Sequence, residues 1–305
     1  MKQRAIELLK ANLAIFFAEL FNALNINSQK YLLPEWSSPV TMFLLRSGFA
    51  LLVFWIISFA INKKTKERPV PIHDKLKMIL AGILFLSGYI IFYLYGVEKS
   101  SQIDSALLFT TMPVFVLLLS HFFFQDRITT RKLLGLLLAL SGTTWVIVEQ
   151  NSHGQTSVNT LAGNLFCLIS ALSYAFYLIT NKQFVKRYGI FTILKWVFTG
   201  AFIVSVILTI IKGFDARVLT AGTEPRALLI LIFVLIFPTV LTYILLPYGL
   251  KKLNTVTAAI YDYEVPVVAT FIAVIFMNEP LASYQIISAI FIFTGVFFVS
   301  SEKQN

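Results

Sequence analysis

Four ionisable residues lie within long apolar stretches of this 305-residue sequence. They are Glu19, Arg46, Asp262 and Glu264. Inside a lipid bilayer, such a side chain costs roughly 2.5–3.5 kcal/mol at the centre of a helix, so each one needs a partner or a function. A buried carboxylate in this setting can bind a proton, a coupling ion or an amine. The four residues are therefore candidate binding groups.

Glu19 lies near the middle of the apolar segment 11–29 and interrupts its hydrophobic run. At about 100° per residue, Asn12, Asn22 and Lys30 fall within roughly 60° of Glu19 on the same helix face. This face forms a polar stripe with a single acid. The pattern indicates a binding face for a proton, a coupling ion or an amine.

An ion pair between Glu19 and Arg46 is the alternative interpretation. Counting about 1.5 Å per residue from the opposite ends of two adjacent segments places both residues near mid-depth. Such a pair could fasten two helices together, or it could open when a solute binds and act as a switch. The sequence leaves both roles open.

Asp262 and Glu264 stand just before Pro266. They are about 200° apart on a helix, so at most one can point squarely into a central cavity. The proline leaves a backbone carbonyl without its usual donor, and we expect a kink there that exposes backbone and side chain together. The alternative is that one acid pairs with Lys251 or Lys252 near the end of the segment.

Two pairs of tyrosines have the spacing of neighbours on one helix face. Tyr89 and Tyr93 are four residues apart, and Tyr174 and Tyr177 are three apart. Such pairs present ring faces and hydroxyls together, as the walls of a binding cavity do. Packing in an apolar core is the alternative for any single tyrosine, because the chain has 12.

The composition indicates that these residues are positioned by helices in a membrane. The chain is 57% hydrophobic and only 13% charged, with a mean hydropathy of +0.79, whereas soluble chains have about 45–50% apolar and about 25% charged residues. The apolar runs are near the length of a spanning helix, about 20 residues, and do not alternate as barrel strands do. The expected fold is an all-α membrane protein with ten transmembrane helices, at 11–29, 39–61, 76–97, 103–124, 132–149, 159–181, 190–211, 227–249, 255–277 and 282–301.

The net charge of +10 is explained by the orientation of these helices. With ten spans, the loops on the side of the N-terminus carry 18 of the 25 Lys and Arg residues, and the loops on the other side carry five. This asymmetry follows the positive-inside rule and predicts that both termini are cytoplasmic. It predicts a multi-pass protein of the bacterial cytoplasmic membrane and removes the reason to expect nucleic-acid binding.

The sequence repeats itself once. A shift of 153 residues places Tyr95-Gly96 on Tyr248-Gly249, and a shift of 152 places Asn12 on Asn164 and Lys30 on Lys182. Residues 1–153 and 154–305 are thus expected to be two five-helix repeats. Because five is odd, the second copy enters the membrane from the opposite side, which predicts inverted repeats and suits alternating access.

Each half also ends with a proline-bearing helix, an acid at the following turn, and a glycine midway along the last helix. These features are Pro113, Asp126 and Gly142 in the first half and Pro266, Glu279 and Gly295 in the second. With these residues, and with Arg46 and Lys30, nearly the whole chain resembles the drug/metabolite transporter superfamily, specifically its ten-helix group of paired EamA repeats. The resemblance implies an inner-membrane carrier of amino acids, other metabolites or drugs, commonly an exporter, with its binding cavity between the halves.

The expected function is thus secondary transport of a small organic metabolite, such as an amino acid or related compound, with possible proton coupling through Glu19. An uncoupled facilitator and a membrane receptor or scaffold remain as alternatives. The sequence has no HExxH motif and no phosphate-binding glycine loop, so we expect neither an enzyme nor a metal or other cofactor. The expected partners are a small-molecule substrate and the lipid bilayer, and the sequence leaves the oligomeric state undetermined.

Overall fold

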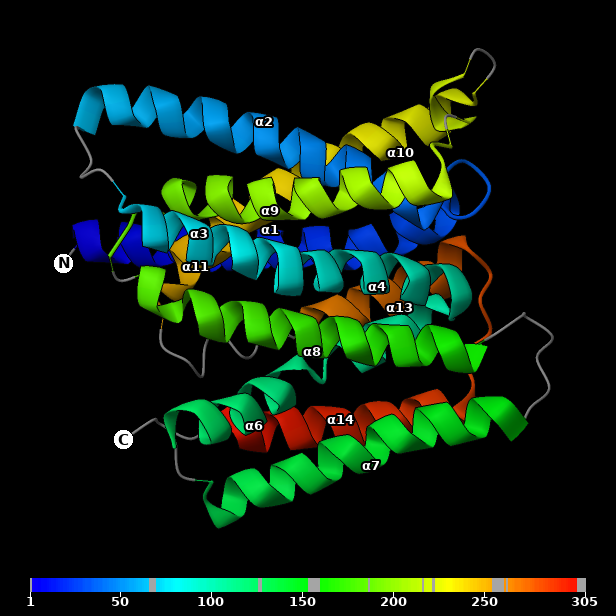
Figure 1. The fold of residues 1–305 in the computed structure, drawn as a ribbon. Coiled ribbons are helices and arrows are strands. Elements are labelled where there is room, and N and C mark those ends of the chain that lie inside the picture. The colour runs from blue at the N-terminus through cyan, green and yellow to red at the C-terminus, as the bar shows by residue number, and fades with distance from the viewer. Residues whose placement is uncertain are drawn as a thin grey trace.

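The computed structural model describes residues 2–65, 70–125, 128–152, 160–185, 187–215, 217–220, 223–253, 261 and 263–300. Every regular element in this part of the chain is helical, as expected (Figure 1). The α-helices are α1 (Lys2–Leu32), α2 (Pro39–Thr65), α3 (Ile72–Ala81), α4 (Ser87–Lys99), α5 (Gln102–Phe109), α6 (Met112–Phe124), α7 (Thr130–Ser152), α8 (Thr160–Val185), α9 (Ile190–Lys212), α10 (Pro225–Ile236), α11 (Thr242–Leu250), α13 (Glu264–Phe276) and α14 (Ser283–Ser300). Two π-helical turns, η1 (Gly82–Leu86) and η3 (Phe237–Leu241), and a 3-10 turn, η2 (Arg217–Leu219), complete the elements.

Eight stretches among the described residues are long and apolar enough to cross a membrane. Three of these stretches contain more than one element. The first consists of α3, η1 and α4, the second of α5 and α6, and the third of α10, η3 and α11. Helix α1 is 31 residues long but is not among the eight. Helix α13 is a shorter apolar helix of 13 residues, and the residues just before it lie partly outside the described ranges. The eight stretches lie at eight of the ten expected spans, α1 contains the range of the first and α13 lies within that of the ninth, so the count of ten remains a prediction.

Prolines mark where two of the helices begin. Helix α6 begins at Met112, directly before Pro113, and α13 begins at Glu264, two residues before Pro266. Proline fits the first turn of a helix because the backbone donor that it lacks would be unused there. The Thr111 hydroxyl donates to the Leu108 carbonyl at 2.6 Å and so binds one of the backbone acceptors at the end of α5. Pro113 therefore interrupts its span near mid-length, between α5 and α6, rather than only bending it.

The two halves of the chain pack against each other helix by helix. Helix α1 lies along α11, and α4 lies along α8, so a helix from each half contacts one from the other (Figure 1). Helices α2 and α9 form a third such pair, and α7 and α14 form a fourth at one side of the molecule. Gly135 and Gly295 let the backbones of α7 and α14 approach closely, since an added side-chain carbon on either would lie within 2.6 Å of a backbone atom of the partner helix.

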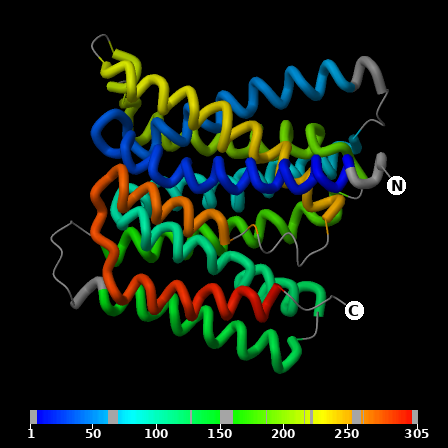
Figure 2. The backbone as a smooth tube through the Cα atoms, turned by 180° about the vertical axis from the view of Figure 1, so that it is seen from behind, coloured from blue at the N-terminus to red at the C-terminus, as the bar shows by residue number. Residues whose placement is uncertain are grey.

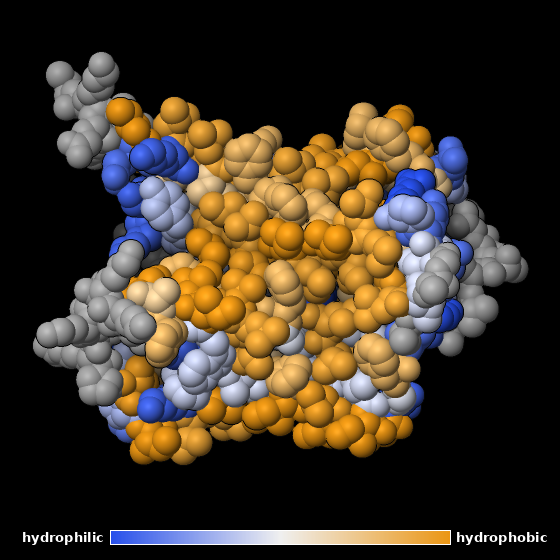
Figure 3. Space-filling view, turned by 90° about the horizontal axis from the view of Figure 1, so that it is seen from above, coloured by the Kyte–Doolittle hydropathy of each residue, from blue (hydrophilic) through white to orange (hydrophobic). Residues whose placement is uncertain are grey.

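Both ends of the chain lie at one end of the bundle (Figures 1 and 2). We call this the terminal end and the opposite one the far end. In the space-filling view, a broad hydrophobic band lies between hydrophilic zones at the two ends (Figure 3). A band of this kind is the surface that a protein presents to lipid.

The far end is fastened by two charged groups that cap a break between helices. The Lys30 ammonium donates to the carbonyls of Val97, Glu98 and Ser100 at 2.6–3.1 Å, where α4 ends. The Glu279 carboxylate accepts from the backbone N–H groups of Gln102 and Ile103 at 3.1 and 3.2 Å, where α5 begins. Charges of these signs are favourable at the two kinds of helix end. A third contact at this end is the ion pair of Asp215 with Arg217, which lowers the pKa of the Asp215 carboxyl through their hydrogen bond.

We expect the substitution Glu279→Ala to lower the free energy of unfolding by about 2 kcal/mol, because it leaves two N–H groups at the start of α5 without an acceptor. Thermal unfolding in detergent measures the change. Glu224→Ala is the control, because among the described residues the side chain of this far-end acid accepts one hydrogen bond, an exposed one from Tyr31. Equal melting temperatures for the two variants would contradict the capping role.

Candidate functional site

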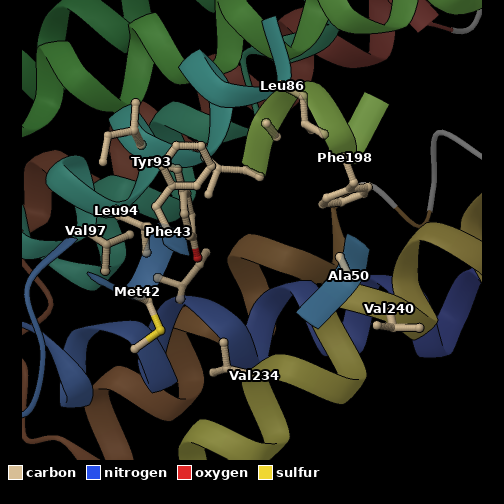
Figure 4. Close-up of a cluster of buried hydrophobic side chains, with 14 of the residues drawn as sticks. Met42, Phe43, Ala50, Leu86, Tyr93, Leu94, Val97, Phe198, Val234 and Val240 are labelled. Carbon is tan, nitrogen blue, oxygen red and sulfur yellow. The ribbon is translucent and has the colours of Figure 1, made fainter. Parts of the chain in front are cut away.

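The largest hydrophobic cluster lies where helices from both halves meet. Figure 4 shows its side chains, with Phe43 from α2, Leu86 and Tyr93 from η1 and α4, Phe198 from α9 and Val240 from η3. All of these side chains are buried. They form a rigid apolar frame, and the polar groups described next are held within it.

The four tyrosines predicted as cavity walls come together in this frame. The Tyr89 and Tyr174 ring centroids are 4.6 Å apart, Tyr174 and Tyr177 stack at 5.6 Å, and Tyr89 and Tyr93 lie 6.2 Å apart. Phe109 of α5 contacts both Tyr89 and Tyr93 at 5.7–5.8 Å. We call these five residues the tyrosine cluster. It joins α4 of the first half to α8 of the second half.

Glu19 and Arg46 lie beside this cluster and are both buried, with exposed fractions of 5% and 3%. The Glu19 carboxylate accepts from the Asn22 side chain at 3.1 Å, and the Arg46 Nε donates to the Thr239 hydroxyl at 2.9 Å. Both charges act electrostatically on the Tyr89 hydroxyl. These two hydrogen bonds take the charged groups to different partners, and the shared binding site remains a prediction.

Several polar residues of this region were not predicted from the sequence. Asn25 donates to the Tyr93 hydroxyl at 2.9 Å, and the Gln29 amide donates in turn to Asn25 at 3.3 Å. The shift of 152 residues places Asn25 on Tyr177, and this equivalence was the signal that could have identified it. Nothing in the sequence singled out Thr239, because its role depends on a contact with a residue 193 positions away.

The two acids of the ninth expected span have different outcomes. Asp262 lies outside the described residues. Glu264 is partly buried in the first turn of α13, and its Oε1 has no hydrogen-bond partner within the described part of the chain. No recorded contact among the described residues joins Glu264 to the tyrosine cluster, so its expected place in the cavity remains a prediction. Within those residues, no group of three or more His, Cys, Asp or Glu side chains could hold a metal ion.

What this arrangement can do chemically follows from its parts. Stacked tyrosine rings offer apolar faces and hydroxyls to an organic molecule, while a buried acid and a buried guanidinium offer sites of opposite charge. The site lies between helices of two halves that match each other in sequence. Ligand sites of transporters with repeated halves lie in this position.

Comparison with known proteins also indicates a transporter, over nearly the whole chain. The model of the EamA-like transporter family matches twice, at residues 9–148 and 161–301. The chain is similar to the "Uncharacterized transporter YyaM" of Bacillus subtilis, with 24% identity over 280 residues that cover 91% of this chain and 89% of that protein. It is also similar to an "Uncharacterized transporter" of Archaeoglobus fulgidus, with 23% identity over 266 residues that cover 87% and 90% of the two chains.

A solved crystal structure has the same fold, with a TM-score of 0.62 and 18% identity, and the match covers 95% of this chain and 96% of the other. The family model covers almost all of both halves. The relatives named above are transporters, and the eight apolar stretches indicate a multi-pass membrane protein. The chain belongs to the EamA-like transporter family.

Proposed function

We propose that this chain is a secondary transporter that exports a small organic metabolite, such as an amino acid or a related compound, across the bacterial cytoplasmic membrane. The observation that carries the proposal is the tyrosine cluster with Glu19 and Arg46 beside it, buried between the two halves. Aromatic walls with one acid and one base suit a solute that has an apolar body and charged groups. The whole chain takes part, because each half contributes side chains to the site.

Alternating access would follow from the two repeats. Residues 1–153 and 154–305 have five expected spans each, so the second repeat is inverted relative to the first. Two such halves can exchange their conformations and move the site from one face of the membrane to the other. The packing of α1 on α11 and of α4 on α8 supports this symmetry, because it pairs helices across the halves. Both termini, at one end of the bundle, would be cytoplasmic.

Glu19 is the proposed coupling group. It acts electrostatically on Tyr89 of the tyrosine cluster, and its repeat equivalent at the 152-residue shift is Ala171. An acid that only fastened a helix could stand in either half, whereas a proton-binding group is needed once. The alternative is an uncoupled facilitator, in which Glu19 only shapes the cavity.

The test is a comparison of the solutes released by cells that express this chain and by cells that carry an empty vector, at matched growth. We expect at least one small organic solute to accumulate outside only in the presence of the chain. The purified protein in liposomes should then move that solute. If no solute pool changes in either direction, and liposomes with the protein move none of the cell's abundant amino acids, the transport proposal is wrong and the receptor alternative gains weight.

A further inference from the structure

The third expected span of each half contains a π-helical turn and a hydroxyl that bonds to a backbone carbonyl, and the two hydroxyls stand at equivalent positions of the repeat. Directly after η1, the hydroxyl of Ser87, the first residue of α4, donates to the Gly82 carbonyl at 2.8 Å. In η3, the Thr239 hydroxyl donates to the Val234 carbonyl at 2.7 Å. The shift of 152 residues places Gly82 on Val234 and Ser87 on Thr239. Each half therefore has one widened turn in its third span, with a hydroxyl bonded to the carbonyl five residues earlier.

The two equivalent hydroxyls, of Ser87 and Thr239, differ in one further contact. The Thr239 hydroxyl also accepts a hydrogen bond from the Arg46 Nε at 2.9 Å. The same shift places Arg46 on Phe198, so the first half has no guanidinium in the equivalent position. A hydroxyl has a single proton, and Thr239 uses it on Val234, so its oxygen can only accept from Arg46. The Arg46 Nε–H can only donate, so the Thr239 oxygen accepts from it while the Thr239 proton stays on the Val234 carbonyl.

Arg46 is a buried cation that this single bond does not satisfy. Its side chain is 3% exposed, and among the described residues no carboxylate forms an ion pair with it. By comparison, the buried ammonium of Lys195 donates to the Ser58 hydroxyl at 2.8 Å and also lies within 6 Å of the centres of two tryptophan rings. A guanidinium has N–H donors on all three nitrogens, and the two terminal nitrogens form a fork that matches a carboxylate. With Nε held by Thr239, that fork is left for another acceptor.

We propose that Thr239 is a positioning residue that holds the Arg46 guanidinium so that its terminal nitrogens bind an anionic group of the transported solute. The solute is then an organic anion or a zwitterion with a carboxylate or a similar planar anionic group. Its apolar part lies against the tyrosine cluster, since Tyr89 and Tyr93 are within electrostatic range of Arg46. This inference rests on the proposed transport function and adds the charge of the substrate to it.

The experiment measures charge discrimination rather than transport alone. The solute found by the export comparison is tested as a ligand of the purified protein beside its uncharged carboxamide, and leucine with leucinamide and benzoate with benzamide serve as fixed probe pairs. Ligand-induced thermal shifts give a dissociation constant for each compound. In the wild type, we expect the acid to bind at least about tenfold more tightly than the amide, as a charge-assisted hydrogen bond predicts.

Three variants separate positioning from structure. Thr239→Val should remove most of the preference for the acid and leave the affinity for the amide nearly unchanged. Thr239→Ser keeps the hydroxyl and should restore the preference. Ser87→Ala is the matched control, because it removes the equivalent bond to Gly82 in the other half and has no contact with Arg46.

The inference is overturned if the exported solute carries no anionic group, if its amide binds as tightly as the acid, or if Thr239→Val keeps the wild-type preference. The inference is also overturned if Ser87→Ala loses the preference for the acid over the amide as fully as Thr239→Val does. The effect would then come from a general disturbance of the third spans and not from the bond to Arg46. In each of these cases the solute still moves, and the transport proposal stands. If the export comparison finds no exported solute and no probe binds to the purified protein, the transport proposal is wrong and the inference about substrate charge is wrong with it.

Discussion

The substitution Glu19→Gln is expected to reduce uphill transport driven by a proton gradient at least about fivefold while downhill movement of the solute continues. Glutamine has nearly the shape of a protonated glutamate but cannot release a proton. A carrier fixed in this form can still bind and exchange its solute, but it no longer links proton flow to solute flow. Coupling free energies of ~1–3 kcal/mol correspond to effects of about 5- to 150-fold, and we expect a loss of solute accumulation within this range.

The measurement is solute accumulation by liposomes with an imposed pH gradient, together with exchange of the solute in the absence of a gradient. Asn22 donates to the Glu19 carboxylate and can still bond to the glutamine oxygen, so folding should be preserved. Glu224→Gln serves as the control, because this acid is at the far end of the bundle and its carboxylate accepts an exposed hydrogen bond from the Tyr31 hydroxyl. Full gradient-driven accumulation by Glu19→Gln would remove the coupling role and favour the uncoupled facilitator.

The largest effect on stability is expected at Gly200, where α9 meets α3 and η1. A side-chain carbon added at Gly200 would lie 2.1 Å from the carbonyl oxygen of Ile79, and one added at Gly82 would lie 2.0 Å from that of Val197. Backbone atoms cannot rotate away as the end of a side chain can. Gly200→Ala must therefore push two spans apart, and we expect it to lower the free energy of unfolding by about 3 kcal/mol, at the upper end of typical overpacking costs.

The control for this substitution is supplied by the repeat. Gly48 is equivalent to Gly200 at the shift of 152 residues, but a side-chain carbon there would meet only the edge of the Phe202 ring, at 3.2 Å. Gly48→Ala should therefore cost much less, and thermal unfolding of the two variants in the same detergent measures the difference. The close contact of α3 with α9 would be wrong if the two variants had the same melting temperature.

The class of protein, and the proximity of the tyrosines within each pair, could be predicted because they depend on local properties of the chain. Hydropathy alone places helices in the membrane, because an apolar run of about 20 residues spans the bilayer as a helix and satisfies its own backbone hydrogen bonds there. The internal shift identified two matching halves, and the family model matches each of them. Spacing of three or four residues placed the tyrosine pairs on single helix faces, and their rings do lie together.

What the sequence could not provide were the contacts between distant segments. The bond of Arg46 to Thr239 joins residues 193 positions apart, and that of Asn25 to Tyr93 joins residues 68 apart. Such pairs depend on how each helix is rotated about its axis, which hydropathy leaves open in a chain where most faces are apolar. Pro238 lacks the N–H that would otherwise bond to the Val234 carbonyl, which the Thr239 hydroxyl binds instead, but the sequence did not show that Arg46 would reach the same hydroxyl. The sequence by itself thus determined that the chain spans the membrane as two related halves, and only the tertiary structure decided which polar groups of those halves meet.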